Sequence, residues 1–174
     1  MKQRFGIVST HPYDILVLPT QGQLIFTPCP GTKGVDLATS VSQLHQAGAD
    51  AIVTMMTDEE LDKFDASSLP DVVRQNGMTW FHFPVEDDAA PAEAFEQSWQ
   101  ADKPDVLALI EQGKCVAIHC RGGSGRTGFI AAMIMRELGM DEVQATDMVK
   151  GLRPNSLKLP AHTEYLAAHY DIKT

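Results

Sequence analysis

The 174-residue sequence has only three cysteines, an odd and small number that does not suggest a disulfide framework. Reduced thiols are therefore expected. Long apolar runs are also missing, because the stretches 115–118 and 129–135 are far shorter than the roughly 20 residues that a membrane span needs. No charged and then apolar leader opens the chain. We therefore expect a cytoplasmic protein with no membrane association.

Basic residues are scarce as well, since 14 lysines and arginines stand against 23 aspartates and glutamates, giving a formal charge of -9. No basic stripe with interleaved aromatic residues occurs, so nucleic acids and anionic membranes are poor candidate partners. An acidic chain can still bind phosphate where a few cations and backbone amides converge. The hydrophobic content of 44% is enough for the core of one domain, which we expect to be monomeric.

Short strand-like runs alternate with segments of helical period along the chain. We expect strands at 15–18, 23–26, 51–55, 79–83 and 114–119, the last of them central because its interior is apolar. Helices are expected at 36–47, 70–76, 125–138, 141–151 and 160–169, and at 92–112 as two helices or one kinked at Pro104. This order predicts a single α/β domain over 1–174, with a mainly parallel sheet flanked by helices, N-terminal strands within 1–29 and a core over 30–170.

A glycine-rich segment follows the expected central strand and precedes a helix. The five residues between Cys120 and Arg126 are Arg121, Gly122, Gly123, Ser124 and Gly125. Glycine permits conformations that point successive amides inward, and the helix adds its positive N-terminal end, so the loop is suited to hold a phosphate. The same electrostatic field favours a thiolate at Cys120, which is a nucleophile, while Arg126 can clamp the phosphate oxygens with two hydrogen bonds.

Other cysteine or glycine loops fit this segment less well. Residues 123–128 satisfy the dinucleotide pattern GxGxxG, but that fold needs a further strand with an acidic residue about 20 residues on, where 141–150 predicts a helix. The Walker loop fails because Cys120 stands where its first glycine belongs. Sulfurtransferases also use a cysteine loop, and low-molecular-weight phosphatases and some arsenate reductases use CxxxxxR, but the latter place it near the N-terminus.

The motif HCxxGxxR followed by a threonine, with a strand directly upstream, resembles the signature of the cysteine-dependent tyrosine and dual-specificity phosphatases. Further stretches are similar to the kinase-associated phosphatase branch of that superfamily, at 48–53, 58–61, 69–91, 152–154 and 165–166. The similarity covers residues 30–170. It implies a phosphorylated protein as substrate, a protein kinase as a partner to consider, and chemistry without a metal or another cofactor.

Three adjacent carboxylates, Glu86, Asp87 and Asp88, follow the strand expected at 79–83. Crowded like charges can keep one carboxyl protonated as a general acid for the leaving group. Resemblance to the Pro-x-x-Asp loop of the family favours Asp87, with Asp88 as the reserve. The same Asp87, once ionised, can activate the water that hydrolyses a phosphocysteine, while the Thr127 hydroxyl stabilises the departing thiolate.

Two histidines and the two remaining cysteines complete the candidates. We expect His119 to orient the loop and support the thiolate through hydrogen bonds, against the alternative of a packed histidine at a strand end. His162 stands where the family often has a glutamine that positions water, so it is a candidate for that role against an ordinary surface histidine. Cys115 is expected in the core, and Cys29 as a bystander rather than a redox partner.

The leading hypothesis is hydrolysis of phosphotyrosine, and also of phosphothreonine or phosphoserine, on proteins through a metal-independent phosphocysteine mechanism. One alternative is a small-molecule or lipid phosphatase with the same loop, for which Arg121 alone offers extra positive charge between Cys120 and Arg126. The other alternative is a non-catalytic module that captures a phosphorylated partner. The complete set of Cys120, Arg126, Asp87 and Thr127 argues against this module, because binding alone requires neither a nucleophile nor an acid.

Overall fold

The computed structural model describes residues 9–19 and 21–170, in which five strands form one sheet in the order β1-β2-β5-β3-β4. Strand β1 (Asp14–Val17) is antiparallel to β2 (Gln23–Thr27). The strands β2, β5 (Cys115–His119), β3 (Ala51–Thr54) and β4 (Thr79–His82) run parallel. The predicted α/β class and mainly parallel sheet are confirmed, and β5 is the central strand, as its apolar interior indicated.

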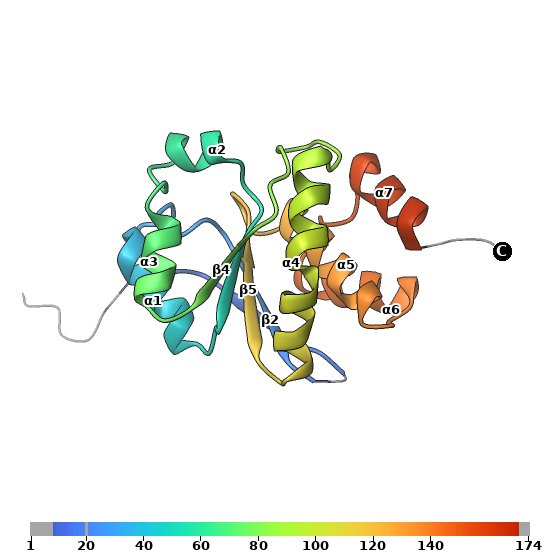
Figure 1. Ribbon diagram of the computed structural model, residues 1–174, viewed down its shortest axis with the longest axis horizontal. Coiled ribbons are helices and arrows are strands. Elements are labelled where there is room, and N and C mark those ends of the chain that lie inside the picture. The colour runs from blue at the N-terminus through green and yellow to red at the C-terminus, as the bar shows by residue number, and fades with distance from the viewer. Residues whose placement is uncertain (1–8, 20, 171–174) are drawn as a thin grey trace, which may run out of the picture.

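Helices cover both faces of the sheet (Figure 1). One face packs against α1 (Leu37–Gln46) and α3 (Leu69–Gln75). The other face packs against α4 (Glu93–Glu111) and α5 (Gly125–Glu137), with α6 (Glu142–Leu152) and α7 (Pro160–Tyr170) beyond them. Successive residues of β5 alternate between the two cores, since Ala117 belongs to the first and Ile118 to the second. Burial on both faces explains why this strand is apolar throughout its interior.

Of the two alternatives for 92–112, the division into two helices is wrong, because α4 is one helix that contains Pro104. Proline removes one helical hydrogen bond and costs about 3 kcal/mol in a helix interior. Pro104 is on the exposed side of α4, where water can solvate the unpaired carbonyl. Four buried side chains lie before and after it, namely Phe95, Trp99, Val106 and Ile110. Burial of this shared apolar face outweighs the proline and keeps the helix continuous.

The short helix α2 (Asp58–Lys63) was not predicted from the sequence. Its start is a capping box, in which the Thr57 hydroxyl accepts from the Glu60 amide and the Glu60 carboxylate accepts from the Thr57 amide. The pattern Thr-x-x-Glu is a sequence signal for such a start. The remaining predicted helices and strands agree with the structure to within a residue or two. Asp141 is the N-cap of α6, since its side chain accepts a hydrogen bond from the Gln144 amide.

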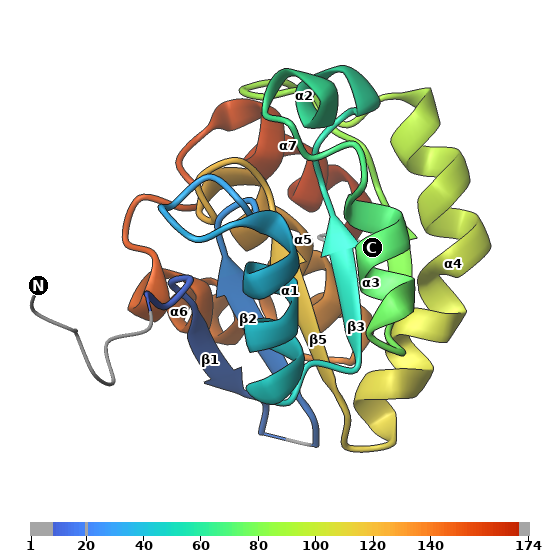
Figure 2. The same ribbon diagram turned by 90° about the vertical axis from the view of Figure 1, so that its left-hand side faces the viewer.

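Four strands end at the same edge of the sheet because they are parallel, and Figure 2 shows β3 running toward the end of the molecule where α2 lies. The chain leaves β3 toward α2, leaves β4 toward the three carboxylates at 86–88, and leaves β5 into the cysteine loop. Ligands of open α/β sheets bind at this edge. Within the described ranges, no helix has both the length and the apolar character needed to cross a membrane.

Candidate active site

The loop after β5 folds around the sulfur of Cys120, which is buried at 4% exposure. Two donors point at the Sγ atom, the Gly123 amide at 3.3 Å and the Thr127 hydroxyl at 3.2 Å. Gly123 has a φ of +80°, and a Cβ built there would lie 2.6 Å from the carbonyl carbon of Thr27. Only glycine therefore allows the loop to approach β2 this closely. Donors on sulfur stabilise a thiolate, so the local geometry suits a nucleophilic cysteine.

The loop is braced from outside by the segment that follows α6. Arg153 donates from Nε to the Gly123 carbonyl at 3.0 Å, and the Ser156 hydroxyl donates to the Ser124 carbonyl at 2.6 Å. Arg153 is itself held by Asp14 at 2.7 Å. Carbonyls that are bonded outward leave the following amides free to face inward, toward the place of a bound anion.

His119 is fully buried at the end of β5 and holds the backbone of the loop. The Thr54 hydroxyl accepts from the Trp80 indole at 2.8 Å, so its own proton is free to donate to His119 Nε2 at 2.7 Å. The proton of the ring then lies on Nδ1, which donates to the Cys120 carbonyl at 3.1 Å. Burial lowers the pKa of His119 to about 4, which keeps the ring neutral. His119 thus orients Cys120 through its backbone, and no hydrogen bond of the described residues joins the ring to Sγ.

Arg126 is the second residue of α5 and is 1% exposed. It is held by a carboxylate that the sequence did not reveal. Its Nη1 donates to Glu60 Oε1 at 2.6 Å and to the Val85 carbonyl at 2.8 Å, and its Nη2 donates to Glu60 Oε2 at 2.9 Å. The capping box at Thr57 predicts where α2 begins, but it does not predict a partner 66 residues away. Glu60 therefore both caps α2 and fixes the guanidinium.

The charges of this pair support each other. Burial alone would raise the pKa of Glu60, but hydrogen bonds and attraction from Arg126 lower it overall. Burial alone would also lower the pKa of Arg126, whereas Glu60, Cys120 and Asp87 raise it. Both side chains are therefore charged at neutral pH. The Nε atom of Arg126 is buried and has no partner among the described residues, so one guanidinium donor is left for a bound oxyanion.

The loop after β4 brings Asp87 closer to this guanidinium than its neighbours. Asp87 Oδ1 lies 3.6 Å from Arg126 Nη2, and its side chain is 56% exposed. Asp88 is also exposed and has a φ of 57°, a left-handed conformation that Asp tolerates in turns. Glu86 is exposed and lines a hollow of about 300 Å³ together with Asp87 and Glu60.

His162 is at the start of α7 and is 2% exposed, so the alternative of a surface histidine is wrong. Its ring packs on Phe129, with centroids 4.9 Å apart, and burial lowers its pKa. It lines a hollow of about 330 Å³ together with Asp87, Asp88 and Arg126. The Nε2 atom is buried and has no partner among the described residues. The structure thus places His162 beside the candidate site.

The other two cysteines differ from Cys120. Cys115 belongs to the core between the sheet and α1, as predicted. Cys29 lies beside the loop, because its amide donates to the Arg121 carbonyl at 3.0 Å. Burial, with the neighbouring Cys120, raises the pKa of Cys29 to about 12, so its sulfur stays protonated at neutral pH. 

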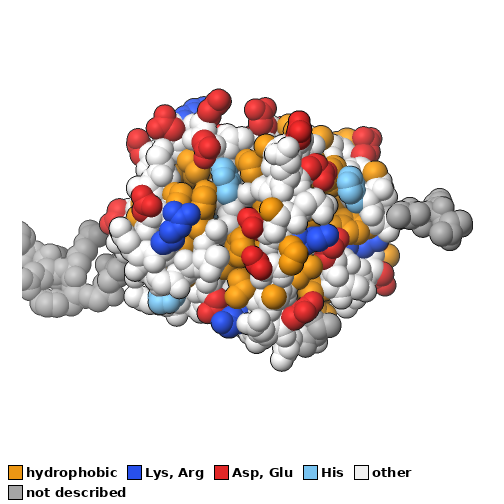
Figure 3. All heavy atoms as spheres, viewed as in Figure 1, with side chains coloured by type: hydrophobic (Ala, Val, Ile, Leu, Met, Phe, Trp, Pro, Cys, Tyr) orange, Lys and Arg blue, Asp and Glu red, His pale blue; other side chains and the backbone are white. Residues whose placement is uncertain are grey.

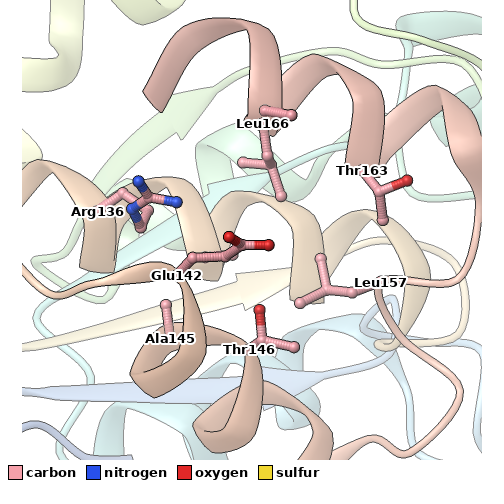
Figure 4. A pocket seen from close by; sticks show the side chains of 9 residues that line it. Arg136, Glu142, Ala145, Thr146, Leu157, Thr163 and Leu166 are labelled. Carbon is pink, nitrogen blue, oxygen red and sulfur yellow. The ribbon is translucent and has the colours of Figure 1, made fainter. Parts of the chain in front are cut away.

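A separate hollow of about 170 Å³ lies between α5, α6 and α7 (Figure 4). Figure 4 shows Arg136 and Glu142 at this hollow with Leu157 and Leu166. None of the predicted catalytic residues lines it. The hollows that Asp87 and Arg126 line are instead at the edge of the sheet where the strands end.

Comparison with known proteins assigns the chain to a family. Residues 32–139 match the family described as "Tc-R-P: Polymorphic toxin system, DSP-PTPase phosphatase". The chain belongs to this DSP-PTPase family. The matched region contains the cysteine loop, the carboxylates of the loop after β4, and Glu60.

Relatives of this DSP-PTPase chain include human cyclin-dependent kinase inhibitor 3, which is 28% identical over 130 residues, 71% of this chain and 60% of the relative. Human protein tyrosine phosphatase type IVA 3 is 25% identical over 127 residues, 70% of this chain and 65% of the relative. The chain thus spans less than two thirds of the length of these curated relatives.

Solved structures show the same fold. A crystal structure of kinase associated phosphatase, with its catalytic-site cysteine replaced by serine, superimposes with a TM-score of 0.83 at 22% identity and covers 94% of this chain and 96% of its own. The active form of Tk-PTP has a TM-score of 0.69 at 24% identity and covers 89% of this chain and 99% of its own. The predicted membership of the cysteine-dependent phosphatases, near the kinase-associated branch, is confirmed.

Proposed function

We propose that this chain hydrolyses phosphate monoesters on proteins, phosphotyrosine first and also phosphoserine and phosphothreonine, with Cys120 as the nucleophile. The observation that carries the proposal is the position of the Cys120 sulfur at the floor of an amide loop, with the Gly123 amide and the Thr127 hydroxyl donating to it. A thiolate there faces the place where a phosphate would bind the amides of residues 121–126 and the free Nε donor of Arg126.

In the first step, the Cys120 thiolate attacks phosphorus, an S–P bond forms and the P–O bond to the substrate breaks. The leaving oxygen needs a proton, and Asp87 is the carboxyl that lies nearest to the Arg126 guanidinium in the loop after β4. Asp88 is the reserve. Arg126 and the loop amides stabilise the charge that develops on the equatorial oxygens. No step requires a metal ion or another cofactor.

In the second step, water attacks phosphorus, the S–P bond breaks and phosphate leaves. Asp87, now ionised, takes the proton of the water, and the Thr127 hydroxyl stabilises the thiolate that re-forms. The unpartnered Nε2 of His162, beside the hollow that Asp87 also lines, supports a water held between the two side chains. His162 would then be a positioning residue for hydrolysis.

Phosphorylated proteins are the proposed substrates because one group of the relatives is named protein tyrosine phosphatase. The name of the kinase associated phosphatase structure makes a protein kinase a reasonable partner to test with this chain. Nucleic acid and membrane lipids are not proposed as partners, because the chain carries a net charge of -9.

The test is the release of phosphate from an aryl phosphate and from phosphotyrosine, phosphothreonine and phosphoserine peptides, in the presence of a chelator. We expect turnover by the wild type and its loss in Cys120→Ser. Cys115→Ser is the matched control, since Cys115 is buried on the preceding strand and outside the loop. Acid quenching should trap a phosphocysteine on Cys120. Turnover that survives in Cys120→Ser would refute the assignment of the nucleophile.

A further inference from the structure

Two cations lie near one aromatic ring beside the cysteine loop, and a third lines a hollow together with that ring. The guanidinium carbon of Arg121 lies 5.0 Å from the ring centroid of Phe64, and the Nζ atom of Lys63 lies 5.6 Å from it. Lys33 lines a hollow of about 430 Å³ with Phe64, Arg121, Gly122 and Thr32. The side chains of all three cations are exposed. We call this space the Lys33–Arg121 hollow.

These cations differ from Arg74, Arg126 and Arg153 because they have no acidic partner among the described residues. Arg74, Arg126 and Arg153 each lie within 4.0 Å of an aspartate or glutamate. Over residues 9–19 and 21–170, no such ion pair involves Lys33, Lys63 or Arg121, and no carboxylate lines the Lys33–Arg121 hollow. Acidic side chains are spread over the face that Figure 3 shows, so a positive hollow is a local exception in a chain of net charge -9. An unneutralised positive site attracts an anion.

We propose that the Lys33–Arg121 hollow binds a second negatively charged group of the substrate, a carboxylate or a phosphate, next to the phosphate that is hydrolysed. This inference rests on the proposed function. Arg121 directly follows Cys120, so an anion on Arg121 belongs to the immediate surroundings of the scissile phosphate. A guanidinium binds either anion with two parallel hydrogen bonds. Stacking on Phe64 restricts the Arg121 side chain before binding, which lowers the entropy lost when the anion is bound.

The adjoining hollow is less favourable for the same anion. It shares Phe64 and Arg121 with the Lys33–Arg121 hollow and is also lined by Lys63, but its lining includes four carboxylates, Glu59, Glu60, Glu86 and Asp87. Of these, Glu60 is neutralised by Arg126, whereas Glu59 and Glu86 repel a second negative group. The entrance to the loop is therefore positive toward Lys33 and negative toward Glu86. An acidic group should therefore raise kcat/KM for a peptide when it lies on one flank of the phosphorylated residue, but not when it lies on the other.

The experiment compares kcat/KM for phosphotyrosine peptides that carry, on either flank, neutral residues, one aspartate or one phosphoserine, with an aryl phosphate as the substrate without a second anion. We expect the anion on one flank to raise kcat/KM by about 1.5- to 5-fold, the range for an exposed charge contact. The gain should shrink at high salt. The aspartate and phosphoserine arms distinguish the two sources of negative charge.

The variant Lys33→Gln should remove most of this preference and leave the rate with the aryl phosphate unchanged. Lys158→Gln is the matched control, because Lys158 lines the hollow near Asp88 and His162 and not the one near Phe64. The Kd values of the same peptides for Cys120→Ser give the comparison without turnover, so the inference stays testable if the proposed hydrolysis fails. The inference would be overturned if neutral and acidic peptides had equal kcat/KM and equal Kd values, or if Lys33→Gln and Lys158→Gln lost the preference for acidic peptides to the same extent.

Discussion

Removal of the Glu60 carboxylate is the perturbation with the clearest consequence, because it leaves Arg126 buried without its partner. Breaking a buried ion pair from one side costs about 3–5 kcal/mol. The Glu60 side chain is 20% exposed and its water contact offsets part of that cost, so we expect Glu60→Ala to lower the free energy of unfolding by about 2–4 kcal/mol. For a domain of this size, that corresponds to a fall in Tm of roughly 5–15 °C.

The kcat/KM of Glu60→Ala should fall by more than the loss of folded protein explains. Without Glu60, the guanidinium keeps the Val85 carbonyl and is free to turn toward Asp87, 3.6 Å away, which would displace both the clamp and the acid. A misplaced clamp of this kind costs on the order of 100-fold in kcat/KM. Glu60→Gln keeps one oxygen acceptor for the guanidinium, so its loss of activity should be smaller.

Urea denaturation and initial rates with an aryl phosphate measure the two effects on the same preparations. Glu59→Gln is the control, since Glu59 is the preceding residue of α2, is exposed and has no ion pair among the described residues. We expect this control to match the wild type in both assays. If Glu60→Ala retains the stability and the kcat/KM of the wild type, the view that Glu60 positions Arg126 is refuted.

Three further predictions concern other parts of the site. Burial lowers the pKa of His119 to about 4 from 6.5, so the unfolded chain gains a proton first as the pH falls. The contribution of His119 to the free energy of unfolding is therefore full above pH 6.5 and falls by about 3 kcal/mol toward pH 4. Urea midpoints measured across that pH range check this, and they should depend less on pH in His119→Gln. Gly123→Ala should abolish turnover and lower the free energy of unfolding by about 2 kcal/mol or more, because the added Cβ would clash with the backbone of Thr27. Gly122→Ala is the control and should leave the urea midpoint unchanged, because a Cβ there has no other atom within 4 Å. His162→Leu should slow the hydrolysis of phosphocysteine, so that this intermediate accumulates after a rapid burst of product, and His162→Gln should restore steady turnover. If the wild type and His162→Leu have the same burst and the same steady rate, the role of His162 in hydrolysis is contradicted.

Local sequence determined the parts of this protein whose cause is local. The period of apolar residues gave the strands and most helices their places, because a strand buried on both faces and an amphipathic helix each need their own pattern. The cysteine loop is also local, since the nucleophile, the amides, Arg126 and Thr127 lie within eight consecutive residues. The sequence left open whether Pro104 divides 92–112 into two helices, because the burial of Phe95 and Ile110 on one face depends on packing that the sequence does not display.

Tertiary structure alone decided the partners of the loop. Glu60 reaches Arg126 across 66 residues, Arg153 reaches Gly123 across 30, and Thr54 reaches His119 across 65. The contacts of Glu60 and Thr54 exist because parallel strands end at one edge of the sheet, whereas Arg153 reaches the loop from the segment that follows α6. Neither the spacing nor the type of these residues signals the pairing, because a glutamate at the surface and a glutamate that holds a buried guanidinium are the same residue type in the sequence. Their chemistry was set by the fold that removed Arg126 and His119 from water.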